Sequence, residues 1–220
     1  MGRRMAPLTL DTVADLPKAA RRCVFWELDA VAAQRAEEAG YPDFEKEAWI
    51  SSVLLQWGPC GRLVHVDEQA VGFVMYAPPS YVPRQTGFAT SPVSGDAVLL
   101  TTGWIDPAFR GQGLARMLLQ GAAKDLTQRG VKAVEAFGGT HLVPGGDGDE
   151  RCAHDTSEPC VLPVHLLESV GFTVVRPHHR YPRLRLELKN AISWREDVEA
   201  ALERLLGSVR VPVLSGIAHG

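Results

Sequence analysis

The chain has 220 residues, 45% of them hydrophobic, which suits one well-packed domain with extensions. Its formal net charge of -3 gives no electrostatic reason to expect nucleic-acid binding. No stretch approaches the roughly 20 apolar residues of a membrane span, and the basic amino terminus lacks the apolar segment of a signal peptide, so we expect a cytoplasmic protein.

The first quarter of the chain predicts one strand and two helices. A short strand is expected at residues 6–10, and Asp11 or Thr12 would cap a helix that continues toward Leu28. A second helix is expected from about Asp43 until the Gly-Pro pair at residues 58–59 ends it. Its expected apolar face consists of Phe44, Ile50, Val53, Leu54 and Trp57.

A hairpin and a central strand follow. Residues 62–66 and 70–76 have strand patterns on either side of Asp67-Glu68-Gln69, which predicts a hairpin. Residues 78–95 are rich in Pro, Ser, Thr and Gly and should form an irregular connection. The next apolar run predicts a strand at residues 97–105, with a bulge expected at residues 101–103 because glycine within a strand often marks one.

Residues 105–119 carry the most informative pattern. The strand breaks at Pro107 and, after a turn with two glycines, becomes a helix predicted over residues 112–129 and ended by Gly130. Backbone N–H groups at the start of such a helix point outward together and can bind a phosphate. The turn lacks the lysine of a Walker loop, and Arg116 stands where a dinucleotide-binding fingerprint needs Gly or Ala.

The remaining pattern, Arg110-x-x-Gly113-x-Ala115, resembles the Arg/Gln-x-x-Gly-x-Gly/Ala pyrophosphate loop of the GNAT superfamily of N-acetyltransferases. Its context supports the resemblance, because a strand precedes it, a long amphipathic helix follows and another strand is predicted at residues 131–137. Residues 168–172, Glu-Ser-Val-Gly-Phe, are similar to a helix end typical of the family.

The resemblance implies an α/β fold, with a GNAT-like mixed sheet flanked by helices and a domain spanning residues 1–190. It also implies acetyl-CoA as cosubstrate, with the pyrophosphate held by the turn and the pantetheine arm paired with the end of the central strand. The residues expected to bind the cosubstrate are Trp104, Ile105, Arg110, Gly111, Gln112, Gly113, Leu114 and Ala115. Glycine at positions 111 and 113 would let the backbone approach the phosphates closely.

The proton donor departs from the family pattern. Many members have a tyrosine four residues before the glycine of the Gly-Phe pair, and this chain has Leu167 there. Another side chain, a water molecule or release of the free thiolate must then complete the reaction. Possible replacements are His165, Ser169 and Tyr181, and possible general bases are Glu27 and Asp96.

An acidic insert is expected at residues 138–160. It could attract a cationic amine or could be a solvated loop. Cys152, His154, Cys160 and His165 could form a metal set, but their spacing matches no common zinc pattern, so we expect no metal and four reduced cysteines. A basic cluster at residues 176–185 could face the ribose phosphate, an acidic partner or, as a hairpin edge, solvent.

An extra helix is predicted after residue 190. Ser193 to Glu196 is a capping-box pattern, and the apolar face that follows could pack on the domain or form a homodimer contact. The main hypothesis is an N-acyltransferase that moves an acetyl group from acetyl-CoA to a primary amine of a small molecule or peptide, by direct attack in a ternary complex. The alternative is a non-catalytic acyl-CoA-binding regulatory module of the same fold.

Overall fold

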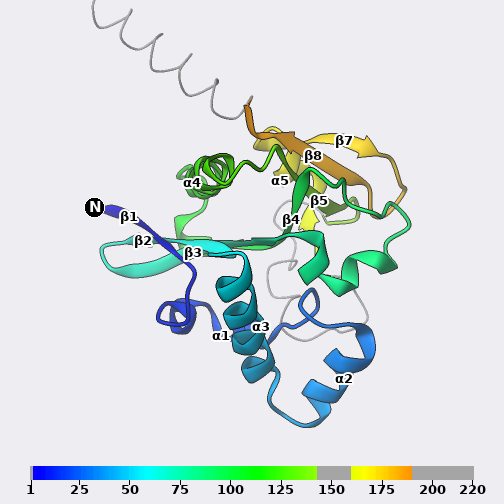
Figure 1. Ribbon diagram of the computed structural model, residues 1–220. Coiled ribbons are helices and arrows are strands. Elements are labelled where there is room, and N and C mark those ends of the chain that lie inside the picture. Colours follow the sequence, from blue (N-terminus) through cyan, green and yellow to red (C-terminus); the bar gives the residue numbers. More distant parts are fainter. Residues whose placement is uncertain (1, 143–159, 190–220) are drawn as a thin grey trace, which may run out of the picture.

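A mixed sheet lies at the centre of the fold in the computed structural model, which describes residues 2–142 and 160–189 (Figure 1). The strands run in the order β1-β2-β3-β4-β5-β8-β7, and β6 pairs with β5 beside this path. The strands are β1 (Arg3–Pro7), β2 (Gly61–Val66), β3 (Gln69–Ala77), β4 (Ala97–Ile105), β5 (Ala133–Gly139), β6 (Leu162–Pro163), β7 (Thr173–Arg176) and β8 (Arg183–Glu187). Among the described strands, only the β4–β5 and β5–β6 pairs are parallel. The predicted α/β architecture with a mixed sheet is confirmed.

Helices cover both faces of this sheet. They are α1 (Lys18–Arg22), α2 (Ala30–Glu38), α3 (Pro42–Gln56), α4 (Leu114–Gln128) and α5 (Val164–Ser169). In Figure 1, α4 lies on one side of β2 and β3, and α1 and α3 lie on the other. Alternate residues of each strand therefore enter different apolar layers, so Leu63 packs on the α3 side while Val64 packs on the α4 side.

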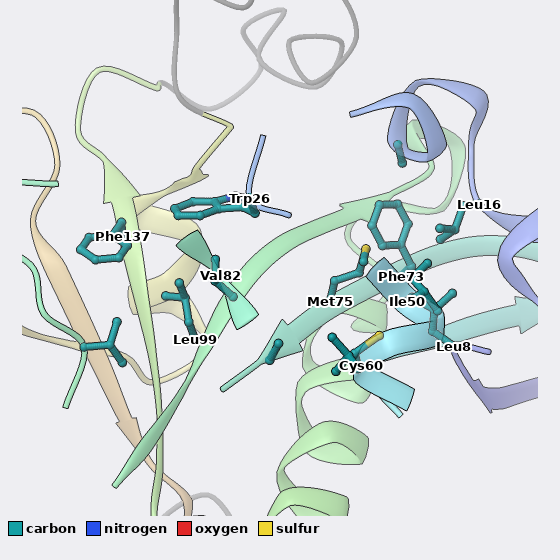
Figure 2. Close-up of a cluster of buried hydrophobic side chains, with 14 of the residues drawn as sticks. Leu8, Leu16, Trp26, Ile50, Cys60, Phe73, Met75, Val82, Leu99 and Phe137 are labelled. Atoms are coloured by element: carbon teal, nitrogen blue, oxygen red, sulfur yellow. The ribbon is translucent and has the colours of Figure 1, made fainter. Parts of the chain in front are cut away.

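The layer on the α3 side contains most of the large aromatic residues. Figure 2 shows Trp26 and Phe137 at one end of this layer and Phe73 and Ile50 at the other. Trp26 is 1% exposed and stacks on Phe88 and Phe137, with ring centroids 5.3 and 6.1 Å away. The segment between α1 and α2 thus belongs to the core.

The predicted helix from residue 12 to residue 28 is wrong. The chain instead forms a 3-10 turn at Val13–Asp15, the short α1 and an irregular segment up to Asp29. Leu16 is extended, with ψ 143°, because the ring of Pro17 disfavours a helical conformation in the residue before it. The unpredicted α2 begins after Asp29, whose Oδ1 accepts hydrogen bonds from the N–H groups of Val31 and Ala32.

The other elements of the first half follow the predictions closely. β1 begins earlier than expected because residues 3–7 pair with residues 62–66 of β2. The hairpin turns at Asp67 and Glu68, which both have positive φ, as a two-residue hairpin loop requires. The core-facing positions of α3 include Lys46, Ile50 and Val53, whereas Phe44, expected there, is 65% exposed.

The second half contains the predicted strand, turn and helix. β4 has the predicted bounds, and α4 begins at Leu114, two residues later than predicted, and ends at Gln128. The region at 78–95 contains two short 3-10 helices, Pro79–Tyr81 and Pro83–Gly87. The predicted helix after residue 190 and residues 143–159 of the acidic insert lie outside the described residues. Within residues 2–142 and 160–189, no helix has the length and apolar character that crossing a membrane requires.

Candidate functional site

The strands β4 and β5 separate after the first third of β4. They pair only from Ala97 to Leu99 of β4, opposite residues 133–135 of β5. On its other side, β4 has one extra residue, because Met75 of β3 pairs with Thr102 while Tyr76 pairs with Leu100. Thr101 is therefore a bulge, and its hydroxyl donates to the Met75 carbonyl at 3.2 Å. The bulge predicted at residues 101–103 is confirmed.

After Leu99, β4 is no longer paired with β5, so backbone groups along this edge of β4 are unpaired by β5. The N–H of Asp106 donates to the Val71 carbonyl of β3 at 2.8 Å. Because successive N–H groups of a strand point to opposite sides, those of Gly103 and Ile105 face away from β3. β6 pairs with the far end of β5, and Leu162 of β6 would lie 3.7 Å from a Cβ at Gly103. We call this region, bounded by β4, β5 and β6, the strand divergence.

The turn after β4 leads from the strand divergence into α4. A 3-10 turn at Pro107–Phe109 is capped by Asp106, whose Oδ1 accepts from the Ala108 N–H at 2.9 Å. Gly111 and Gly113 have φ of 74° and 78°, the left-handed region that glycine adopts readily, and Gly113 is the N-cap of α4. A Cβ at either glycine would meet no heavy atom within 4 Å, so both open onto free space.

The turn has several unused backbone donors. Among the described residues, the N–H groups of residues 111–115 donate to no other group of the chain. Leu114 is 1% exposed and anchors the first turn of α4 in the apolar layer, while residues 111–113 are exposed. Free N–H groups at the positive end of a 15-residue helix, beside two glycines without steric obstruction, can bind an anion. This arrangement fits the predicted pyrophosphate loop.

Three arginines surround the turn. Arg110 is exposed, with its Nε 3.5 Å from the Ile105 carbonyl, and Arg116 reaches the Ser169 carbonyl from the first turn of α4, also at 3.5 Å. The third is Arg3 of β1, whose Nη1 lies 3.2 Å from the Gln112 carbonyl. Arg3 was not among the predicted site residues, because no local sequence pattern shows which strand will lie beside the turn.

The candidate proton donors lie on α5. His165 is exposed, and the Ser169 hydroxyl donates to the Leu166 carbonyl at 2.7 Å. Leu167, at the position where the resemblance implies a tyrosine, is 1% exposed and packs against β5, where its Cδ1 would lie 3.3 Å from a Cβ at Gly138. That position therefore provides an apolar contact rather than a proton.

The two candidate general bases are both ion-paired. Glu27 contacts Lys46 of α3 inside the protein, and their side chains are 1% and 2% exposed. Asp96 accepts from both terminal nitrogens of Arg185, at 2.9 and 3.0 Å, and these hydrogen bonds hold the pKa of Asp96 below its usual value. The lowered pKa makes the Asp96 carboxylate a weak base, and the Glu27 carboxylate is buried in its contact with Lys46, so both placements favour structural roles.

The basic cluster at residues 176–185 does not form a uniform solvated edge. Arg183 and Arg185 turn toward the buried Glu135 of β5, with N–O distances of 2.7 and 3.1 Å. Tyr181 packs its ring edge-on against Phe88, with centroids 5.7 Å apart, and is partly buried. This part of the cluster fastens β8 to β5.

The possible metal set is only partly described. Cys152 and His154 lie outside the described residues, and Cys160 is in a disulfide, so the expectation of four reduced cysteines is wrong for Cys160. Cys23 and Cys60 are free thiols. Within the described ranges, no group of three or more His, Cys, Asp or Glu residues is arranged to hold a metal ion.

The model of the acetyltransferase (GNAT) family matches residues 26–142, which include α3, β4 and α4. Among curated proteins, no sequence matches the chain.

Several solved structures share the fold. The PaiA N-acetyltransferase of Thermoplasma acidophilum in complex with coenzyme A is 12% identical, with a TM-score of 0.54 over 85% of this chain and 99% of that one. YncA of Salmonella typhimurium, a putative acetyltransferase with acetyl-CoA, is 16% identical, with a TM-score of 0.52 over 86% and 95%. An N-acetyltransferase of Staphylococcus aureus is 12% identical, with a TM-score of 0.51 over 86% and 99%.

Proposed function

Because the chain belongs to the acetyltransferase (GNAT) family, we propose that it transfers an acetyl group from acetyl-CoA to the primary amine of a small molecule or peptide. Acetyl-CoA is the cosubstrate of this family. The similar structures from Thermoplasma and Salmonella, which contain coenzyme A and acetyl-CoA, support the same choice of cosubstrate.

The observation that carries the proposal is the turn between β4 and α4. Its unused N–H groups at residues 111–115 would bind the pyrophosphate of acetyl-CoA, and Arg110 would add a charge-assisted contact. Gly111 and Gly113 leave space for the phosphates to approach the backbone. The sequence pattern and the conformation of the turn thus support the same ligand.

The strand divergence would position the reacting thioester. The backbone N–H groups of Gly103 and Ile105 face this region, where they can pair with the pantetheine arm and donate to the thioester carbonyl oxygen. The amine nitrogen then attacks the carbonyl carbon, the C–N bond forms and the C–S bond breaks. The amine loses one proton, and the thiolate of coenzyme A gains one.

We infer that this proton exchange uses His165 or solvent. Leu167 cannot donate a proton, and the Ser169 hydroxyl already donates to the Leu166 carbonyl. His165 is an exposed titratable side chain on the same helix, and an imidazole can exchange protons near neutral pH. Glu27 is disfavoured as the base because its carboxylate is buried with Lys46.

A second candidate function is a regulatory module that binds acyl-CoA without turning it over. The buried Leu167 at the usual tyrosine position favours it, since the described part of α5 supplies no tyrosine in its place. Both functions use the same turn, so they differ only in whether the acyl group leaves the thioester.

Two measurements test these proposals. Isothermal titration of the full chain with acetyl-CoA should show binding at sub-millimolar concentration, and its absence would overturn both functions. Release of free thiol from acetyl-CoA, followed with a panel of small and peptide amines, should then rise with amine concentration. Binding without amine-dependent release of thiol would favour the regulatory module.

A further inference from the structure

The amino-terminal strand extends the candidate coenzyme A site. Arg3 of β1 donates from Nη1 to the backbone carbonyl of Gln112 at 3.2 Å, across 109 positions of sequence. Arg3 and Met5 lie on the α4 side of the sheet, since they pair with Val66 and Val64, both of which pack in that layer. Met5 also reaches α4, because its Sδ would lie 2.7 Å from a Cβ at Gly121. β1 therefore supports both the turn and the helix that follows it.

The position of Arg3 is itself fixed. The N–H of Gly2 donates to Asp67 Oδ1 at 2.8 Å, and the N–H of Asp67 donates back to the Gly2 carbonyl at 3.1 Å. This reciprocal pair fastens the chain directly before Arg3 to the turn of the β2–β3 hairpin. Arg3 thus projects from an anchored backbone rather than from a frayed end.

The contact with Gln112 fixes the orientation of one peptide unit in the turn. In a trans peptide, the carbonyl of Gln112 and the N–H of Gly113 point in opposite directions. Because Arg3 binds the carbonyl on the β1 side, the Gly113 N–H is directed away from β1. Gly113, which flanks this peptide on one side, has no side chain that restricts its φ and would otherwise let the peptide rotate more freely.

We propose that Arg3 is a positioning residue for the pyrophosphate of acetyl-CoA, a role that rests on the proposed function of the turn. Arg3 holds the peptide between Gln112 and Gly113 with its N–H directed at the phosphates. Its guanidinium also adds a positive charge near the start of α4, on the side of this peptide opposite the Gly113 N–H.

Arg4 offers a matched control. It has the same charge and lies one residue further along β1, but it pairs with His65 and therefore faces the opposite side of the sheet. Among the described residues, its guanidinium forms no hydrogen bond or ion pair with the turn, whereas that of Arg3 donates to the Gln112 carbonyl. A loss of net charge alone would affect Arg3→Ala and Arg4→Ala equally.

The test measures affinity for coenzyme A, dephospho-coenzyme A and pantetheine in the wild type, Arg3→Ala, Arg3→Gln and Arg4→Ala. Arg3→Ala should weaken binding of the first two ligands by the same factor, about tenfold, as expected for one charge-assisted hydrogen bond, and leave pantetheine unchanged. Arg3→Gln should restore part of the affinity, because its amide can still donate to the Gln112 carbonyl. Arg4→Ala should match the wild type.

Kinetics provide a second readout. With Arg3→Ala, the KM for acetyl-CoA should rise by the same factor while kcat and the KM for the amine stay unchanged. Equal affinities of wild type and Arg3→Ala for coenzyme A would overturn the inference. A loss seen only with coenzyme A and absent with dephospho-coenzyme A would also overturn it, because Arg3 would then bind the ribose phosphate. No binding by the wild type would instead overturn the proposed function itself.

Discussion

Glu27 and Lys46 form an ion pair inside the protein, with Lys46 Nζ 2.5 Å from Glu27 Oε1 and both side chains almost completely buried. The pair joins α3 to the segment after α1. Among the described residues, Glu27 Oε2 has no hydrogen-bond partner. The pair is thus an ion pair buried within an apolar layer, where each charge is stabilised by the opposite charge of its partner.

We expect Glu27→Gln and Lys46→Met each to destabilise the protein by about 3 kcal/mol, because each leaves an uncompensated charge or polar group in the core. The double variant Glu27→Leu/Lys46→Met should recover most of this loss. Urea unfolding followed by tryptophan fluorescence measures the free energies. A Glu27→Gln variant of wild-type stability whose kcat is nonetheless abolished would contradict the structural role and support Glu27 as a general base.

Gly113→Ala should weaken coenzyme A binding at least tenfold, because the added methyl group occupies space that the phosphate needs. Gly130, at the other end of α4, is the control, since its φ is also 78° and a Cβ there would also meet no atom within 4 Å. Both substitutions should lower the free energy of unfolding by about 1 kcal/mol through left-handed backbone strain. Only Gly113→Ala should alter the dissociation constant measured by titration calorimetry, and equal affinities of the two variants would place the phosphates elsewhere.

His165→Gln should lower kcat by about a hundredfold if the imidazole carries the proton, with no change in the affinity for acetyl-CoA. Because His165 is exposed, its replacement should leave the melting temperature unchanged. Ser169→Ala is the control on the same helix, and it should retain wild-type kcat because, among the described residues, its hydroxyl bonds only the Leu166 carbonyl. Wild-type kcat in His165→Gln would leave solvent as the proton donor.

Cys60 should make the protein less stable at alkaline pH. Burial raises the pKa of this thiol to about 12, while an unfolded thiol ionises near pH 9. The unfolded state therefore loses its proton first, so stability is complete below pH 9 and falls by about 1.4 kcal/mol per pH unit as the pH rises from there. Cys60→Ala should show a smaller decrease in the free energy of unfolding between pH 9 and pH 10, and identical decreases would refute this assignment.

Much of the candidate site could be predicted because it is local in sequence. The end of β4, the glycine turn and the start of α4 are continuous, and their form depends on Pro107, two glycines and an apolar repeat. The bulge at Thr101 was also indicated by the neighbouring Gly103. The prediction of a helix from residue 12 to residue 28 was wrong. Pro17 holds Leu16 in an extended conformation, and this interrupts the helix that the residue pattern favours.

The sequence by itself determined the glycine turn before α4, the alternating strands and the presence of Leu167 where the family pattern has a tyrosine, since each depends on neighbours a few positions apart. Only the tertiary structure decided that Arg3 would contact Gln112, that Glu27 would be neutralised by Lys46, and that β4 would leave β5 after Leu99. The physical reason is that the hydrogen bonds and side-chain spacing that form a helix, strand or turn involve residues close together in sequence. The pairing of distant charges and strand edges depends instead on how whole layers pack.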